Sequence, residues 1–248
     1  MAGCFIPYNP SIEFGRTTRS TKESFVSQNE TPTDSGSQQD IRDALQAIGR
    51  QFFLRGWSVG TSSNYSAVIG RDPLRLLITA SGQDKGRLGA ADFVVVDECG
   101  QCADALHAGA ARPSAETLLH VIAAMRMGAN AVLHTHSVWA TILSDLFFAD
   151  GAIEFEGYEM LKGLSGVTTH EHRFRLEIVE NSQDIAAMSR EIGSRLTAAE
   201  RPIRHGFLIR RHGLYTWGRD LEEARRRVEI LEFLLEVRGR ELSLGARR

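Results

Sequence analysis

The chain has 248 residues, of which 42% are hydrophobic and 24% charged, and this composition suits one globular domain with a substantial core. With 29 basic and 31 acidic residues the formal net charge is -2, which argues against a surface for nucleic acid or anionic membranes. The sequence shows no apolar run that would span a bilayer and no signal-peptide pattern, and three cysteines are too few for a disulfide framework. We therefore expect a cytoplasmic protein that binds neither nucleic acid nor membranes.

The first 38 residues differ from the rest of the chain. They are rich in Ser, Thr, Gln and Asn and show no apolar periodicity. The sequence predicts a disordered or loosely packed tail over 1–38 and one folded domain over 39–248. An exposed arm that packs on a partner subunit is the alternative for the first half of the tail.

Regular elements are predicted throughout the folded part. Apolar residues at helical spacing predict helices over 41–55, 114–127, 138–147, 182–199 and 220–238. Short apolar runs between Gly-containing turns predict strands over 65–69, 74–79, 93–97, 131–133, 174–179 and 207–211. Because strands and helices interleave without a regular βαβ rhythm, we expect an α/β fold with a mixed sheet and helices on both faces.

Two histidines follow a buried strand in the stretch Ala-Val-Leu-His-Thr-His-Ser. On a strand alternate residues face the same side, so His134 and His136 present their imidazoles to one point. Buried histidines need polar partners. At this stage they are either metal ligands or two hydrogen-bonded core residues.

A catalytic zinc site uses three protein ligands and keeps a fourth position open. His212 is the strongest third candidate, because it ends the predicted strand 207–211 and precedes Gly213, where a ligand can come close. His170 and His172 form a second alternating pair, but they lie among charged residues and are not expected to bind metal.

Two carboxylates are candidates for acid–base chemistry. Glu116 stands at the first turn of a predicted helix, where it also suits the helix dipole. Glu159 lies in Tyr-Glu-Met-Leu-Lys-Gly, downstream of the histidine pair, and its alternative role is a solvated helix charge.

Three segments offer hydroxyls and free backbone N–H groups that suit phosphate oxygens, although such segments are usually only turns. One precedes a strand, one follows a strand near Lys85, and one begins a helix. Their candidate residues are Thr61, Asn64, Ser81, Gly82 and Ser114. The P-loop pattern is absent.

Together the motifs GTSSNYS, ITASGQDKG, RPSAETLLH, AVLHTHS, EGYEMLKG and RRHGLYTWG resemble the class II aldolase and ribulose-phosphate epimerase superfamily from about 40 to 238. HTHS with a later RHG marks the superfamily, and Glu159 with the DKG at 84–86 resembles its dehydratase branch. The chain departs from the pattern at Ala80 and Ala115, where relatives often carry Pro and Ser.

This resemblance implies a class II aldolase-like α/β fold, with a central mixed sheet flanked by helices, and a homotetramer. It implies one Zn²⁺ per subunit, held by His134, His136 and His212, although zinc and iron both remain open. Glu159 would be the catalytic acid/base, with Glu116 second. The substrate phosphate would lie around Thr61, Asn64, Ser81, Gly82 and Ser114.

The implied reaction is dehydration of 5-methylthioribulose 1-phosphate to 2,3-diketo-5-methylthiopentyl 1-phosphate in methionine salvage. A neutral Glu159, with a pKa raised by burial, would protonate the leaving C4 hydroxyl. Glu159, Glu116 or a metal-bound hydroxide would take the C3 proton. The alternatives are a class II sugar-phosphate aldolase of the fuculose or rhamnulose type, with Glu116 in the larger role, and a non-catalytic metal-stabilised module that binds partners.

Overall fold

The computed structural model describes residues 37–103 and 111–245. The predicted tail lies outside these residues except for its end, since Ser37 caps helix α1 (Gln38–Leu54) with its side chain. Within the described ranges no helix combines the length and the apolar character that crossing a membrane requires.

The described residues form an eight-stranded sheet in the order β3-β2-β1-β4-β8-β7-β6-β5. Its neighbours pair in antiparallel fashion except β6 and β7, which are parallel, so the sheet is mixed. The strands are β1 (Asn64–Arg71), β2 (Leu74–Thr79), β3 (Phe93–Val96), β4 (Ala131–Thr135), β5 (Ala152–Phe155), β6 (Phe174–Val179), β7 (Gly206–Ile209) and β8 (Gly213–Gly218).

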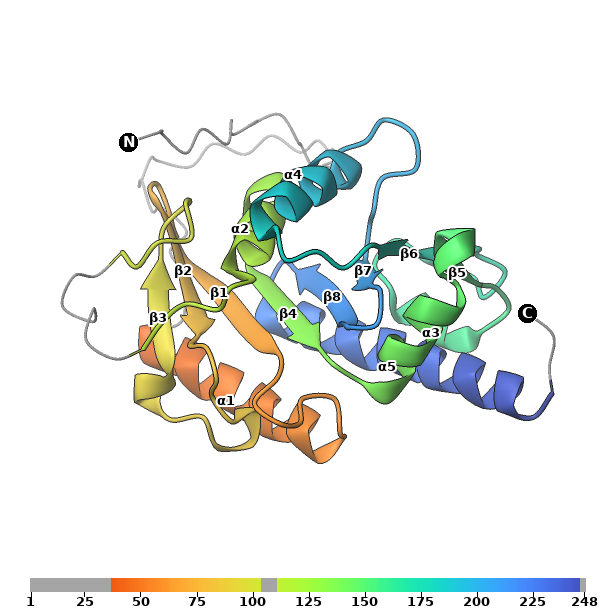
Figure 1. Ribbon diagram of the computed structural model, residues 1–248, viewed down its shortest axis with the longest axis horizontal. Coiled ribbons are helices and arrows are strands. Elements are labelled where there is room, and N and C mark those ends of the chain that lie inside the picture. The colour runs from red at the N-terminus through yellow and green to blue at the C-terminus, as the bar shows by residue number, and fades with distance from the viewer. Residues whose placement is uncertain (1–36, 104–110, 246–248) are drawn as a thin grey trace, which may run out of the picture.

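Helices cover both faces of this sheet, as expected from the sequence. α2 and α4 lie over one face, and α1 and α5 lie over the other (Figure 1). The remaining helices are α2 (Thr117–Arg126), α3 (Val138–Leu146), α4 (Ile185–Leu196) and α5 (Leu221–Ser243), with short 3-10 turns η1 (Lys85–Arg87), η2 (Ala90–Asp92), η4 (Phe148–Asp150) and η5 (Glu159–Gly163).

Strand β4, in the middle of the sheet, is buried on both faces, which explains its unbroken apolar lead-in. Val132 packs in the cluster under α2 and α4, whereas Leu133 packs in the cluster under α1 and α5. Since side chains alternate along a strand, His134 lies on the same face of the sheet as Val132, and Thr135 lies on the same face as Leu133. Thr135 accordingly donates its hydroxyl to Glu232 Oε1 of α5 at 2.5 Å.

The structure corrects the predicted end of strand 207–211. β7 ends at Ile209, and a tight turn follows in which Arg211 has φ 53°, so His212 lies in a hairpin turn. The next strand, β8, was not predicted. The first residue of β8 is Gly213. A Cβ there would lie 1.9 Å from Thr135 O, so glycine at this position permits the close packing of β4 and β8.

The predicted helix at 114–127 also starts later than expected. α2 begins at Thr117, and Glu116 is its N-cap residue. Before it the chain is tied to the end of β2, where Ser81 N donates to Arg112 O at 2.8 Å. This tie brings the segment that carries Ser114 beside the loop that follows β2.

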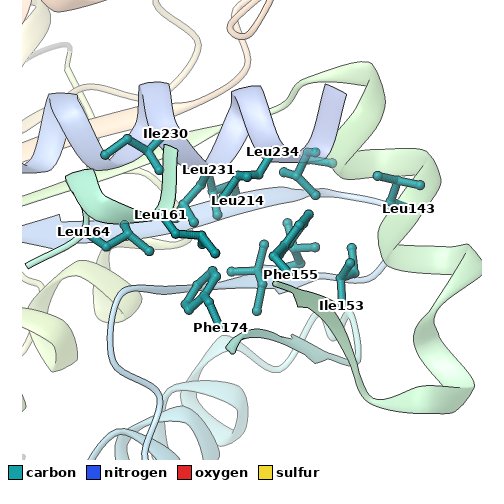
Figure 2. Packing of buried hydrophobic residues seen from close by; sticks show 14 of the residues in the cluster. Leu143, Ile153, Phe155, Leu161, Leu164, Phe174, Leu214, Ile230, Leu231 and Leu234 are labelled. Atoms are coloured by element: carbon teal, nitrogen blue, oxygen red, sulfur yellow. The ribbon is translucent and has the colours of Figure 1, made fainter. Parts of the chain in front are cut away.

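The turn η5, which carries Glu159, packs firmly on α5. Figure 2 shows Leu161 and Leu164 pointing into the cluster formed with Ile230 and Leu231. Gly163 packs closely there, because a Cβ would lie 2.6 Å from Ile230 Cδ1 and would force that side chain to shift. The inner face of η5 is therefore fixed in the core.

Candidate metal centre

Three imidazoles converge at the end of β4. His134 Nε2 lies 2.7 Å from His136 Nε2 and 3.4 Å from His212 Nε2, and His136 Nε2 lies 3.2 Å from His212 Nε2. Glu116 joins them, with Oε1 3.2 Å from His212 Nε2. One donor atom from each of these four residues lies within 4.8 Å of the others.

The chemistry of this donor set fits a divalent cation. His134 Nδ1 lies 2.9 Å from Leu214 O and donates to it, so its Nε2 carries a lone pair toward the other two rings. Burial, followed by the neighbouring imidazoles, lowers the pKa of His134 well below its usual value. Burial likewise lowers the pKa of His136 to about 3. These two imidazoles are neutral, which is the form that binds Zn²⁺.

Each metal-site histidine is fixed by a different part of the fold. His134 lies opposite Tyr215 in the β4–β8 pairing. His136 N donates to Trp57 O at 2.7 Å, in the segment after α1. The carbonyl of His212 accepts from Thr141 Oγ1 of α3 at 3.0 Å. The site therefore depends on the whole fold rather than on one loop.

Glu116 is oriented toward the histidines by two donors. Its Oε2 accepts from Asn64 Nδ2 at 2.9 Å and from Tyr215 OH at 3.0 Å. Burial, together with the Glu116 charge, raises the pKa of Tyr215 well above its usual value, so the phenol keeps its proton. With Oε2 occupied, Oε1 is the oxygen nearest His212. The structure thus brings Glu116 into the metal cluster.

A cavity of about 450 Å³ adjoins the cluster. All five predicted phosphate residues line it together with Glu116, His136 and His212; they are Thr61, Asn64, Ser81, Gly82 and Ser114. Thr61 and Gly82 have left-handed φ values of 63° and 75°. The loops predicted to bind phosphate and the metal cluster therefore lie on the wall of the same cavity.

The sequence predicted that Asn64 contacts the substrate phosphate, but its amide has other partners in the structure. Both hydrogens of its amide are already donated inside the protein, to Ser114 Oγ at 3.2 Å and to Glu116 Oε2 at 2.9 Å. This geometry favours a role in holding Glu116 over a contact with phosphate.

Lys85 is almost completely buried, with 1% of its surface exposed. Its Nζ donates to Gln83 O at 2.7 Å and contacts Thr61 O at 3.5 Å. Lys85 therefore links the loop before β1 to the loop after β2, although it does not itself line the cavity. Burial lowers its pKa to about 8. The sequence indicated the charge of Lys85 but not this structural link.

Glu159 is not brought to the metal cluster within one chain. Its side chain is 71% exposed and pairs with Lys162 Nζ at 2.7 Å and His170 Nδ1 at 3.3 Å. The hydrogen bond from Lys162 holds the pKa of Glu159 below its usual value. The expectation of a buried carboxyl with a raised pKa is therefore wrong for the isolated chain.

The other histidines among the described residues lie outside the cluster. His170 and His172 are exposed, and neither joins the metal-binding group found among the described residues. His120 is fully buried on α2 and contacts Asn64 through its ring. In the sequence, His120 lies between Leu119 and Val121 in the predicted helix 114–127, which gives no signal for this contact.

The class of protein follows from the fold and from comparison with known families. The model of the Class II Aldolase and Adducin N-terminal domain matches residues 43–238. Two solved structures share the fold: L-fuculose-1-phosphate aldolase from Thermus thermophilus (TM-score 0.65, 22% identity, 84% of this chain and 99% of that one) and YgbL, a putative aldolase/epimerase/decarboxylase from Escherichia coli (TM-score 0.67, 24% identity, 85% and 92%). The chain belongs to the class II aldolase family.

Within that family its relatives are more specific. The methylthioribulose-1-phosphate dehydratase of Marinobacter nauticus is 49% identical over 197 residues, which cover 78% of this chain and 91% of that protein. The dehydratase of Pseudomonas fluorescens is 48% identical, over 81% of this chain and 92% of the relative. The chain belongs with the methylthioribulose-1-phosphate dehydratases, and a non-catalytic binding module is no longer a competing interpretation.

Proposed function

We propose that this chain is a zinc-dependent hydro-lyase that removes water from 5-methylthioribulose 1-phosphate and yields 2,3-diketo-5-methylthiopentyl 1-phosphate in methionine salvage. The observation that carries the proposal is the convergence of three imidazoles and Glu116 beside a cavity, whose wall includes Glu116, His136, His212 and the loops predicted to bind phosphate. Relatives that are 41–49% identical and named for this reaction support the substrate. Because sugar phosphates are charged and do not cross membranes freely, the proposed location is the cytoplasm.

His134, His136 and His212 are the proposed ligands of one zinc ion per subunit. Such an ion, when bound, polarises the substrate carbonyl at C2 and so makes the C3 hydrogen acidic. The three side chains would hold the ion, and their own positions are set by the end of β4 and by the turn between β7 and β8.

Glu116 is the proposed base at C3. Its Oε2 is held by Asn64 and Tyr215, so Oε1 is preorganised to accept the C3 proton. As that proton leaves, the C3–H electron pair forms the second bond of a C3=C4 double bond, and the C4–O bond breaks. The C4 hydroxyl departs as water because it receives a proton. The resulting enol then tautomerises to the diketone.

The phosphate group is proposed to bind between the loop before β1, which carries Thr61, and the loop after β2, which carries Ser81 and Gly82. Thr61, Ser81 and Ser114 supply hydroxyls, and Gly82 leaves its backbone open to the cavity. Lys85 adds positive charge behind these loops and holds their carbonyls together. A cavity of about 450 Å³ is in the range of small-molecule sites.

Glu159 is the proposed proton donor to the C4 hydroxyl, acting in the site of a neighbouring subunit of a homotetramer. Its exposure and its fixed position on η5 support this arrangement. α3 also exposes three apolar side chains at four-residue spacing, Val138 at 66%, Ile142 at 49% and Leu146 at 41%. An exposed apolar stripe of this kind marks an interaction surface. Burial of Glu159 between subunits would raise its pKa toward the neutral form.

Retro-aldol cleavage is the second candidate, and one observation favours it: Glu116 lies in the metal cluster, whereas Glu159 does not. The deciding experiment incubates the zinc-loaded protein with methylthioribulose 1-phosphate and, separately, with fuculose 1-phosphate. We expect a product one water lighter from the first and no cleavage of the second. Cleavage to an aldehyde and a three-carbon phosphate would overturn the dehydratase proposal.

A further inference from the structure

A chain of hydrogen bonds leads from the core to Glu116. Ser66 Oγ lies 2.8 Å from His120 Nδ1, and His120 Nε2 contacts Asn64 Oδ1. Asn64 Nδ2 then reaches Glu116 Oε2 at 2.9 Å. Ser66 and His120 are both fully buried, and neither lines the cavity. The mechanism above gives them no role.

The direction of every bond in this chain can be assigned. A carboxylate only accepts hydrogen bonds, so the amide NH₂ of Asn64 faces Glu116 and its Oδ1 faces His120. His120 Nε2 must therefore carry a hydrogen. Burial lowers the pKa of His120 to about 3, so the ring is neutral and carries only that one hydrogen. Nδ1 is then an acceptor, and Ser66 donates to it.

We propose that His120 is a positioning residue for Glu116, which it orients by fixing the amide of Asn64. Donation from His120 Nε2 to Asn64 Oδ1 prevents the amide from turning over, and the fixed NH₂ holds Glu116 Oε2. Glu116 Oε1 is thereby turned toward His212. This inference rests on the proposed role of Glu116 as the base.

The competing explanation is that His120 merely fills space. Its ring packs edge-on against Tyr215, with centroids 5.6 Å apart, and a phenylalanine would preserve that contact. Without the Nε2 hydrogen, however, Asn64 Oδ1 loses its donor, and the amide is held only by its own bonds to Ser114 and Glu116. Phenylalanine and glutamine at position 120 therefore separate packing from hydrogen bonding, because the glutamine amide can still donate.

The first test uses the metal-free protein and is independent of activity. Nitrogen-15 NMR of the histidine side chains reports which ring nitrogen carries the hydrogen. We expect His120 to be neutral and protonated on Nε2 at about pH 6. Protonation on Nδ1, or a charged ring, would overturn the proposal.

The second test compares His120→Phe and His120→Gln, with His205→Phe as the matched control. His205 is also buried, packs against Phe174, and lies outside the cavity. Loss of a residue that orients a metal-site group typically costs about 10- to 100-fold in activity. We expect this fall in kcat for His120→Phe with KM nearly unchanged, most of it recovered in His120→Gln, and none in the control. A His120→Phe enzyme with normal kcat would overturn the proposal.

A double substitution with Glu116→Gln provides the sharper test. If His120 acts only through Glu116, His120→Phe lowers residual kcat no further once Glu116 is replaced. The same variants loaded with Co²⁺ should show an altered visible spectrum for His120→Phe but not for His205→Phe. Equal kcat losses in both backgrounds would mean that His120 acts elsewhere.

If His120→Phe does not fold, Ser66→Ala removes only the donor to Nδ1. We expect the ring hydrogen to stay on Nε2, where Asn64 Oδ1 still accepts it, and kcat to fall several-fold because the ring is held less firmly. A hydrogen that moves to Nδ1 without any loss of kcat would contradict the inference. If the protein fails to dehydrate the substrate at all, the proposed function fails, while the NMR and cobalt spectra still decide the role of His120.

Discussion

The imidazole of His134 stacks on the phenol ring of Tyr215, with centroids 3.9 Å apart and planes inclined by 13°. The two residues are directly opposite in the antiparallel pairing of β4 with β8, so the register of the sheet creates the contact. The hydroxyl of Tyr215 also reaches Glu116 Oε2 at 3.0 Å. One aromatic ring therefore supports both a proposed zinc ligand and the proposed base.

Tyr215→Phe separates these two roles, because it keeps the stack and removes the hydroxyl. We expect one zinc per chain to remain bound and kcat to fall by about 10- to 100-fold, the equivalent of one hydrogen bond to a charged group. Tyr65→Phe is the control, since it removes another buried hydroxyl, bonded to Ser58, outside the cluster. Elemental analysis and steady-state kinetics provide the measurements. Loss of zinc from Tyr215→Phe would show that the hydroxyl mainly supports ligand geometry.

Replacing any one of the three histidines with alanine is expected to remove the metal and abolish turnover. The reason is that a two-histidine remnant provides too few ligands for tight binding. A chelator should likewise inactivate the wild-type protein, and added Zn²⁺ should restore it. The exposed His170→Ala is the control and should keep its metal. Full activity and metal content in His212→Ala would contradict the three-ligand assignment.

Lys85→Met tests the phosphate loops without touching the cavity wall. Because the ammonium group links the carbonyls of Thr61 and Gln83, its loss should loosen both loops and remove a positive charge. We expect KM for the phosphorylated substrate to rise about tenfold, while kcat/KM for the unphosphorylated ketose stays low and unchanged. Arg87→Met, with an 88% exposed side chain, is the control. An unchanged KM would assign Lys85 to stability alone.

Glu232 of α5 accepts a hydrogen bond from Thr135 of β4, the strand that carries His134, and its ionisation is expected to affect the stability of the protein. Burial raises its pKa to about 7, against 4.5 for an unperturbed group, although the hydrogen bonds from Ser137 and Thr135 lower it. The folded state therefore binds this proton more tightly than the unfolded chain does. Its stabilising effect is complete below about pH 4.5 and is lost as pH rises through about 7.

Glu232→Gln is accordingly expected to be more stable than the wild type at pH 8, by about 3 kcal/mol at most. The difference should vanish near pH 4.5. Urea unfolding of the metal-free proteins across this pH range measures it, with the exposed Glu222→Gln on the same helix as the control. A wild type whose stability relative to Glu232→Gln is independent of pH would contradict the raised pKa.

Local patterns were sufficient for part of the site. The alternation at His134 and His136 predicted their convergence, because the direction of a side chain on a strand follows from its position in the local alternation. The roles of Tyr215 and Lys85 were out of reach, since they depend on which strand pairs with β4 and which carbonyls the fold brings together. β8 itself was missed because Gly213 and Gly218 look like strand breakers, whereas both are required by close backbone contacts.

The role of Glu159 came from family resemblance, and nothing in its local sequence determines where it acts. On one chain it lies on the solvent side of η5, paired with Lys162. An assembly is the physical means by which an exposed acid can reach a buried site, because a symmetric oligomer applies the same residue to the neighbouring copy.

Glu159→Gln alone is expected to lower kcat by about 10²–10⁴-fold with zinc still bound and KM nearly unchanged, because a general acid acts mainly in the transition state. Mixing this variant with His212→Ala, itself inactive, should restore up to about a quarter of wild-type activity, since some interfaces then combine intact histidines from one subunit with an intact Glu159 from the next. The matched control mixes Glu116→Gln with His212→Ala; both residues belong to the cluster of one chain, so only Glu116→Gln residual activity should remain. Native mass spectrometry establishes that hybrids have formed. Hybrids without restored activity would place Glu159 outside the neighbouring site, and the retro-aldol reaction with Glu116 as its base would then be the stronger candidate.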